Sequence, residues 1–365
     1  MALKCGIVGL PNVGKSTLFN ALTQTASAQA ANYPFCTIEP NIGKVNVPDV
    51  RLENLAKIAG SAQIIPNQIE FVDIAGLVRG ASKGEGLGNQ FLSHIREVDA
   101  IINVVRCFED ENITHVESSI DPIRDIELIQ LELILADLES LEKRLPNLEK
   151  KLKNEKDAIQ IIETTKKVIE VLKNGQPARI VEVKNIEEEK IIKNLQIITS
   201  KPQLFVCNLK ENEISGNKYS KLVEDFCTKN NFKSVKICAQ VEAEVASLET
   251  EDEKNEYLLT IGLNETGLSQ IIRSAFSLLD LISFFTVGPK ECHAWTVKKS
   301  SLAPKGAGVI HTDFEKGFIR ARTISYEDYI KFNGEEGAKN NGKLRDEGKD
   351  YIIQDGDIFH FMFNN

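Results

Sequence analysis

The 365-residue sequence has no run of 18 uncharged apolar residues, so no part of it is predicted to cross a bilayer as a helix. It starts without the basic leader, apolar core and cleavage site of a signal peptide, and we therefore expect a cytoplasmic protein. Basic residues are in deficit, with 44 Lys and Arg against 53 Asp and Glu and a net charge of −9. A general polyanion binder would be basic over its whole surface, so any contact with nucleic acid must be local.

Cysteine motifs are also missing. The seven cysteines are odd in number, widely spaced and without a Cys-x-x-Cys pair, which argues against a disulfide framework or a zinc site. Several lie in or beside apolar, strand-like runs, where a thiol behaves as a small buried hydrophobe. The sequence has no internal repeat and no low-complexity tract. Its 42% hydrophobic share is enough to fill the cores of roughly two to three domains.

The pattern of the first 120 residues is typical of a parallel α/β domain. Short apolar runs alternate there with glycine-rich turns and helical stretches, which favours a mostly parallel sheet. We assign residues 1–121 and 201–282 to this domain. The expected strands are 3–8, 69–73, 100–105, 204–208 and 235–238.

Residues 122–200 interrupt this domain and are rich in Leu, Glu and Lys. Leucines spaced three and four apart from Leu131 to Leu152 indicate a coiled-coil seam, so we expect an antiparallel helical hairpin with little core of its own. Proline disturbs a helix interior, so the rod should bend or restart at Pro146. Residues 143–156 carry six basic and two acidic residues, and they either contact RNA phosphates or form a solvated face of i,i+4 pairs.

The C-terminal residues 283–365 have a third texture, with many β-formers, glycines and alternating polar and apolar residues. We assign them to a separate, small α+β domain. Arg320 and Arg322 alternate on one expected strand beside Phe318, and this surface is either a contact for RNA or protein or an ordinary sheet face.

The sharpest motif follows the first expected strand and precedes a helix, as a P-loop requires. Glycines let successive N–H groups point at phosphate oxygens, Lys15 supplies a cation for the β- and γ-phosphates, and the Ser16 hydroxyl binds Mg²⁺. The predicted phosphate-binding residues are Asn12, Val13, Gly14, Lys15, Ser16 and Thr17.

Two further segments fit this assignment. Asp73 ends an apolar strand, where it can hold the metal through water, and Gly76 can offer its N–H to the γ-phosphate. Between the P-loop and Asp73, Thr37 lies in a polar loop and is the candidate to close on Mg²⁺ and the γ-phosphate, with an ordinary loop threonine as the alternative.

The base-binding segment departs from the guanine-reading motif Asn-Lys-x-Asp. At the end of the strand 204–208 the chain has Asn208, Leu209, Lys210 and Glu211, so leucine replaces the lysine and a longer glutamate replaces the aspartate. Losing that lysine and displacing the carboxylate weakens the demand for guanine, which favours ATP over GTP. Ala239 lies in the place of the last base-contacting loop.

The group that activates water is not obvious. Leu77 follows the Asp-x-x-Gly motif, and leucine cannot orient a nucleophile. His115, in a polar loop after the strand 100–105, could reach the phosphates or could be a solvated surface residue. Asn12 could also help to bind K⁺ beside the phosphates, where the ion would supply positive charge.

Taken in order, four segments make the chain resemble the Obg-like ATPase, or YchF, family of P-loop proteins. They are Asn12-Val13-Gly14-Lys15-Ser16, Asn32-Tyr33-Pro34-Phe35-Cys36-Thr37-Ile38, Asp73-Ile74-Ala75-Gly76-Leu77 and Asn208-Leu209-Lys210-Glu211. The resemblance covers essentially the whole chain and implies a G domain with a coiled-coil insertion and a C-terminal TGS domain.

It also implies a preference for ATP, binding to ribosomes, and a leucine in place of the catalytic glutamine. Ser16 and Thr37 would be Mg²⁺ ligands, Leu209 would line the adenine pocket, and His115 would be the catalytic group. Lysine at position 210 is unusual for this family.

We therefore predict a monomeric, Mg²⁺-dependent ATPase that changes conformation with nucleotide state near the ribosome. Two alternatives remain open at this point. One is a conventional GTPase, and the other is a non-catalytic clamp for RNA or protein in which nucleotide is only structural.

Overall fold

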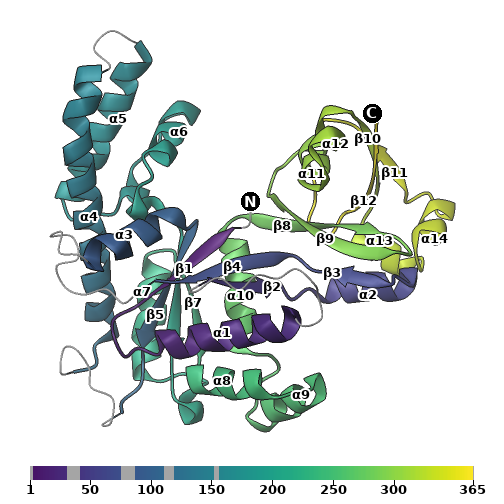
Figure 1. Ribbon diagram of the computed structural model, residues 1–365, viewed down its shortest axis with the longest axis horizontal. Coiled ribbons are helices and arrows are strands. Elements are labelled where there is room, and N and C mark those ends of the chain that lie inside the picture. Colours follow the sequence, from purple (N-terminus) through teal and green to yellow (C-terminus); the bar gives the residue numbers. More distant parts are fainter. Residues whose placement is uncertain (1–2, 31–41, 75–86, 111–118, 152–155, 365) are drawn as a thin grey trace. The chain divides into compact units, whose positions relative to one another are not determined.

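A computed structural model describes residues 3–30, 42–74, 87–110, 119–151 and 156–364. The described chain divides into two compact units (Figure 1). The first contains residues 1–44 and 70–271, and the second contains residues 45–69 and 272–365.

A six-stranded sheet in the order β2-β4-β1-β5-β6-β7 organises the first unit, and the pairings from β4 across to β7 are parallel. The strands are β1 (Lys4–Val8), β2 (Ile42–Asn46), β4 (Gln68–Asp73), β5 (Ala100–Arg106), β6 (Gln203–Asn208) and β7 (Lys233–Ile237). All five strands expected from the sequence are confirmed, and β2 is an addition. Since β4 and β5 flank β1 on opposite sides, the chain reverses its order beside the end of β1, where α/β sheets bind ligands.

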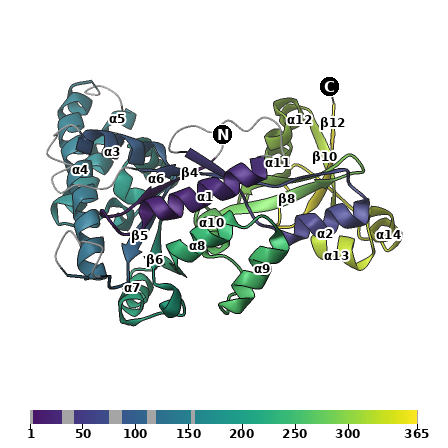
Figure 2. The ribbon, with the colours of Figure 1, turned by 60° about the horizontal axis from the view of Figure 1, so that its bottom comes forward.

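Helices connect these strands, and α1 packs against α8 (Figure 2). Apart from the insertion, the helices of this unit are α1 (Lys15–Ala30), α3 (Leu87–Glu97), α7 (Lys218–Lys229), α8 (Ala239–Ser247), α9 (Glu251–Thr260) and α10 (Gly267–Leu278), of which the last continues into the second unit. The buried Glu242 carboxylate of α8 accepts the first amides of α10, from Gly267 at 2.8 Å and Leu268 at 3.0 Å. This contact satisfies backbone groups that a helix N-terminus leaves without partners.

The insertion between β5 and β6 differs from the expectation in two respects. It contains α4 (Pro122–Lys151), α5 (Lys156–Lys173), α6 (Ile186–Asn194) and the short 3₁₀ helices η2 (Ala178–Ile180) and η3 (Ile198–Ser200). The two long helices form the expected hairpin, but the insertion has a core of its own, because the segment after α5 folds back and buries Val181, Ile191 and Leu195 against them. The helix does not restart at Pro146, because α4 continues through this residue to Lys151.

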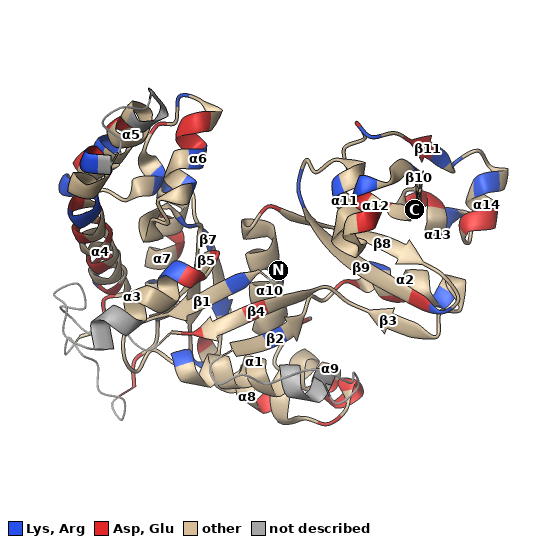
Figure 3. Ribbon diagram, turned by 45° about the horizontal axis from the view of Figure 1, so that its top comes forward, with Lys and Arg blue, Asp and Glu red and all other residues tan. Residues whose placement is uncertain are grey.

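The leucine seam is only partly buried. Leu141 is 1% exposed and packs against α5, whereas Leu131 and Leu135 are 49% and 39% exposed. Figure 3 shows charges of both signs along α4. Of the described basic side chains in the run 143–156, Lys143 pairs with Glu139, and Arg144 donates to the carbonyl oxygen of Leu195 at 2.9 Å.

The second unit is built on a sheet in the order β11-β10-β12-β8-β9-β3. Its strands are β3 (Gln63–Ile65), β8 (Leu281–Val287), β9 (Glu291–Lys298), β10 (Phe318–Ile324), β11 (Arg345–Glu347) and β12 (Ile358–Phe363). Its helices are α2 (Val50–Ala59), α11 (Ala303–Ile310), α12 (Thr312–Lys316), α13 (Tyr326–Lys331) and α14 (Glu335–Asn340).

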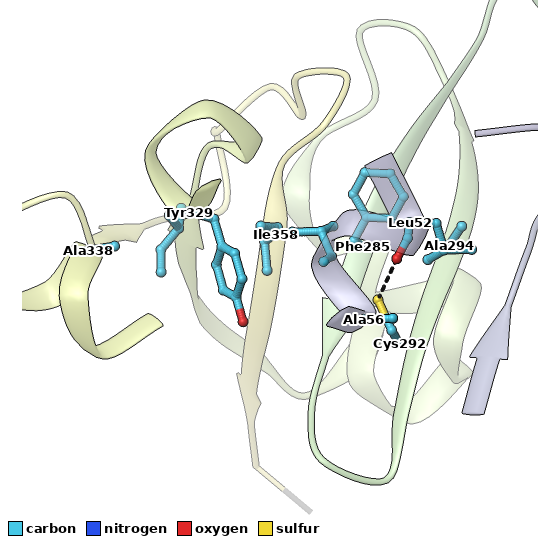
Figure 4. Packing of buried hydrophobic residues seen from close by; sticks show 10 residues of the cluster. Leu52, Ala56, Phe285, Cys292, Ala294, Tyr329, Ala338 and Ile358 are labelled. Atoms are coloured by element: carbon cyan, nitrogen blue, oxygen red, sulfur yellow. Dashed lines mark hydrogen bonds between the residues drawn. The ribbon is translucent and has the colours of Figure 1, made fainter. Parts of the chain in front are cut away.

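This unit corrects the predicted domain boundaries, because residues 45–69 belong to it and not to the α/β domain. Strand β3 pairs with β9, and Leu52 and Ala56 of α2 join a core with Phe285 and Cys292 (Figure 4). The thiol of Cys292 donates to the carbonyl oxygen of Leu52 at 3.7 Å. The partners of residues 45–69 are distant in sequence, so no local pattern indicated this assignment.

Candidate nucleotide-binding site

The loop between β1 and α1 has the backbone conformation that a P-loop needs. Asn12 and Gly14 both have positive φ angles, 65° and 92°. Residue 14 has to be glycine, because a Cβ atom there would lie 2.2 Å from Nδ2 of Asn208. The next residues form the first turn of α1, which contains no acidic residue, so its positive end is free for an anion.

Lys15 and Asp73 face each other at this edge of the sheet. The Lys15 ammonium forms an ion pair with Oδ1 of Asp73, and the two side chains are only 10% and 18% exposed. The pair brings the predicted phosphate-binding cation and the predicted metal-binding carboxylate together from β4 and α1. A bound triphosphate would offer the Lys15 ammonium a partner of opposite charge, and Mg²⁺ would do the same for the Asp73 carboxylate. The two groups can therefore exchange their ion pair for these partners.

Asn208 has a contact that the sequence did not indicate. Its side chain is 4% exposed, donates from Nδ2 to the carbonyl oxygen of Val13 at 2.9 Å, and accepts from the amide of Ala239 at 2.9 Å. We predicted a base-binding role for Asn208 and Ala239. In this structure their hydrogen bonds connect the P-loop to β6 and to the start of α8.

The residues after Asn208 divide between core and surface. Leu209 is 2% exposed, packs among Val105, Phe205 and Val223, and donates its amide to Ile237 at 2.8 Å. Lys210 and Glu211 are both exposed. Of the predicted base-binding residues, Leu209 therefore lies in the core, and Glu211 is exposed to solvent.

The remaining predicted site residues divide in two. Ser16 and Thr17 are exposed in the first turn of α1, next to Lys15. Thr37, Gly76 and His115 lie outside the described residues, as does Leu77.

The donors described here suit Mg²⁺. Mg²⁺ keeps several waters and is held by one or two carboxylates together with substrate phosphates, so the Ser16 hydroxyl and the Asp73 carboxylate fit it. Within the described ranges, no group of three or more His, Cys, Asp or Glu side chains gathers into a metal cage.

Arg106 is a residue at this edge that no sequence motif indicated. It ends β5, is 1% exposed, and donates to the carbonyl oxygens of Phe108 at 3.1 Å and Asp110 at 3.2 Å. Burial lowers the pKa of its guanidinium group. Arg106 shapes the turn that follows β5. Its place as a charged residue at the end of an apolar run could have indicated this role.

No helix within the described ranges has the length and apolar character needed to cross a membrane.

Two family models match the chain. Residues 4–136 match the 50S ribosome-binding GTPase model, and residues 281–364 match the YchF GTPase C-terminal model, which is described as a protein of unknown function. The chain is 53% identical to the "Ribosome-binding ATPase YchF" of Bacillus subtilis and 51% identical to that of Escherichia coli O157:H7, over the full length of each pair. The chain belongs to the YchF family.

The resemblance found in the sequence motifs is thus confirmed. The solved YchF GTPase of Schizosaccharomyces pombe is 38% identical, with a TM-score of 0.88 over 99% of this chain and 97% of that one. A GTP-binding protein from Pyrococcus horikoshii, 22% identical with a TM-score of 0.63, covers 99% of this chain and all of its own, and is similar in fold. The YchF fold is therefore an α/β P-loop GTPase fold with a further C-terminal domain.

Proposed function

We propose that this protein is a Mg²⁺-dependent ATPase that binds ribosomes and changes conformation with its nucleotide state. The observation that carries the proposal is the nucleotide edge itself. There Asn12 and Gly14 have the positive φ angles of a P-loop, Lys15 forms an ion pair with Asp73, and the Asn208 side chain connects the loop to β6 and α8. YchF relatives named as ribosome-binding ATPases support the same activity.

The chemistry is hydrolysis of a phosphoanhydride by water. P-loop amides and the Lys15 ammonium would bind the β- and γ-phosphates and offset the charge that develops on them. Mg²⁺ would be held by Ser16, by Thr37 and, through water, by Asp73, and would supply further positive charge at the phosphates. We propose that Gly76 senses the γ-phosphate, that His115 is the catalytic group, and that Asn12 can help to hold K⁺.

ATP is the proposed substrate because of what this chain offers the base. A guanine site needs an aspartate that accepts hydrogen bonds from the base, and Glu211 stands at its position in the motif. The lysine of that motif is also missing, and the buried Leu209 takes its place. We propose that Asn208, Glu211 and Ala239 form the base side of the site, that the buried Leu209 supports it from the core, and that GTP binds less well.

Ribosome binding would take place in the cytoplasm, with the protein acting as a monomer. The basic run 143–156 is the local positive charge that an acidic protein needs for contact with rRNA phosphates. Two of its basic side chains already have partners. Lys143 forms an ion pair with Glu139, and Arg144 donates to the carbonyl oxygen of Leu195. The proposed rRNA contact therefore depends on the remainder of the run.

Phosphate release from ATP under multiple-turnover conditions, with and without ribosomes, tests this function. We expect many phosphates per chain, a slow rate alone and a faster rate with ribosomes, because Leu77 cannot orient water. The H115A variant should retain ATP affinity and lose most of the release. A single phosphate per chain in both conditions would instead identify a non-catalytic clamp.

A further inference from the structure

The C-terminus of helix α3 is contacted by Lys201, which directly follows the insertion in the chain. The Lys201 ammonium donates to the carbonyl oxygens of Ile95 at 2.8 Å and Arg96 at 2.7 Å, and also to that of Val98. The last carbonyls of a helix lack partners within the helix and form its negative pole, so a cation there is stabilising. Lys201 therefore caps the C-terminus of α3 (Leu87–Glu97).

Burial lowers the pKa of Lys201 to about 8, while the charges of Asp99 and Asp137 oppose this shift and that of Arg96 adds to it. At pH 7 the protonated form, which has three N–H donors, therefore predominates. Three donors match the three carbonyl acceptors on and just beyond α3.

The insertion holds Lys201 in place through Asp137 of α4. The Asp137 carboxylate is 2% exposed and accepts from the amide of Ile198 at 2.9 Å and from the amide and hydroxyl of Thr199, each at 2.7 Å. These residues form η3 (Ile198–Ser200), and the amide of Lys201 donates to Ile198 at 3.1 Å. The contacts thus run from Asp137 on α4 to η3, from η3 to Lys201, and from Lys201 to the end of α3.

The same turn is tied to the rest of the insertion. Ala178 donates its amide to the Thr199 hydroxyl at 3.0 Å, and Arg179 donates to the Thr199 carbonyl at 3.1 Å. Asp137, η3 and Lys201 are therefore one fully hydrogen-bonded group at the base of the insertion. Separating its members would leave buried charged or polar groups without partners, which is costly.

We propose that Asp137 and Lys201 couple helix α3 to the helical insertion, so that nucleotide binding and the state of the insertion influence each other. This inference rests on the proposed function, because α3 follows the Asp73-Ile74-Ala75-Gly76 motif in the chain. A displacement of α3 must either break the three bonds to Lys201 or move η3 and Asp137 with it. Asp137 and Lys201 are positioning residues, and we assign them no contact with nucleotide.

Amide hydrogen exchange of the full-length protein, with and without a non-hydrolysable Mg-ATP analogue, tests this coupling. In the wild type we expect the analogue to change protection in both α3 and α4, by about fivefold or more. In K201M, the analogue should bind within about twofold of the wild-type affinity and still protect α3, while the change in α4 falls below about twofold.

Four further variants separate coupling from a merely structural role. K201R keeps the cation and should restore the response of α4, and K193M removes an exposed lysine of α6 and should leave it unchanged. D137N should reduce the response, and the double variant D137N/K201M should reduce it no further than K201M alone, because the two residues act in series. A normal α4 response in K201M would overturn the coupling, as would loss of protection throughout K201M together with loss of analogue affinity.

A second measurement requires no nucleotide. If the coupling exists, D137N should increase exchange in the last turn of α3 by about fivefold in the wild-type background and by less than about twofold in K201M. Equal increases in both backgrounds would contradict it. Failure of the proposed function can be distinguished from failure of the coupling. In that case the wild type would bind no analogue, while this second measurement would still give the expected difference.

Discussion

Replacement of Lys15 by alanine should reduce ATP turnover at least about a hundredfold, with loss of most ATP binding. The ammonium group is the fixed cation of the phosphate site, and its present partner is the Asp73 carboxylate. Without Lys15, a partly buried carboxylate remains at the edge where the phosphates must bind, so repulsion adds to the lost attraction. Equilibrium titration with Mg-ATP and a phosphate-release assay measure the two effects.

Lys44 provides a matched control for this variant. It also comes from the first unit and pairs with a carboxylate, that of Glu70 at 3.3 Å, but its side chain is 41% exposed and lies outside the proposed site. The K44A variant should therefore change ATP affinity by less than about twofold. Wild-type turnover in purified K15A would refute the phosphate assignment.

Alanine at position 14 should weaken ATP binding by about a hundredfold and lower the thermal stability of the protein. A Cβ atom would lie 2.2 Å from Nδ2 of Asn208, and the φ angle of 92° is unfavourable for any residue with a side chain. The strained backbone costs about 1–2 kcal/mol, and loss of the Asn208 hydrogen bonds costs about another 1–3 kcal/mol. Both changes distort the P-loop. Titration with Mg-ATP and a thermal unfolding curve measure the outcome.

The G60A variant separates the steric effect from the backbone effect. Gly60 also has a positive φ angle, 63°, but a Cβ atom there would meet nothing within 4 Å. We expect G60A to cost about 1 kcal/mol of stability and to leave ATP affinity unchanged. If G14A bound ATP as well as G60A does, the close contact between Gly14 and Asn208 would have no role in the site.

The sequence predicted the parts of this fold that depend on local patterns. Strands β1 and β4 follow from apolar runs, and the P-loop follows from glycines and Lys15 placed between a strand and a helix. These features require no knowledge of distant partners. The meeting of Lys15 with Asp73 could also be expected, because the carboxyl ends of neighbouring parallel strands meet at one edge.

Features that depend on tertiary partners were missed. Residues 45–69 read as part of the α/β domain, yet Leu52 packs on Phe285, more than 200 residues away in the sequence. Asn208 occupies a motif position associated with the base, and only the folded chain places its amide against Val13. The core of the insertion was missed for the same reason, because Val181 and Ile191 lie outside the leucine seam.

Competition between ATP and GTP for the purified protein in the presence of Mg²⁺ tests whether this edge of the sheet binds ATP. We expect saturable binding of one nucleotide per chain, lost in K15A, with ATP bound several-fold more tightly than GTP. Tighter binding of GTP would contradict the assignment of the base side, and no binding of either nucleotide would contradict the phosphate site itself.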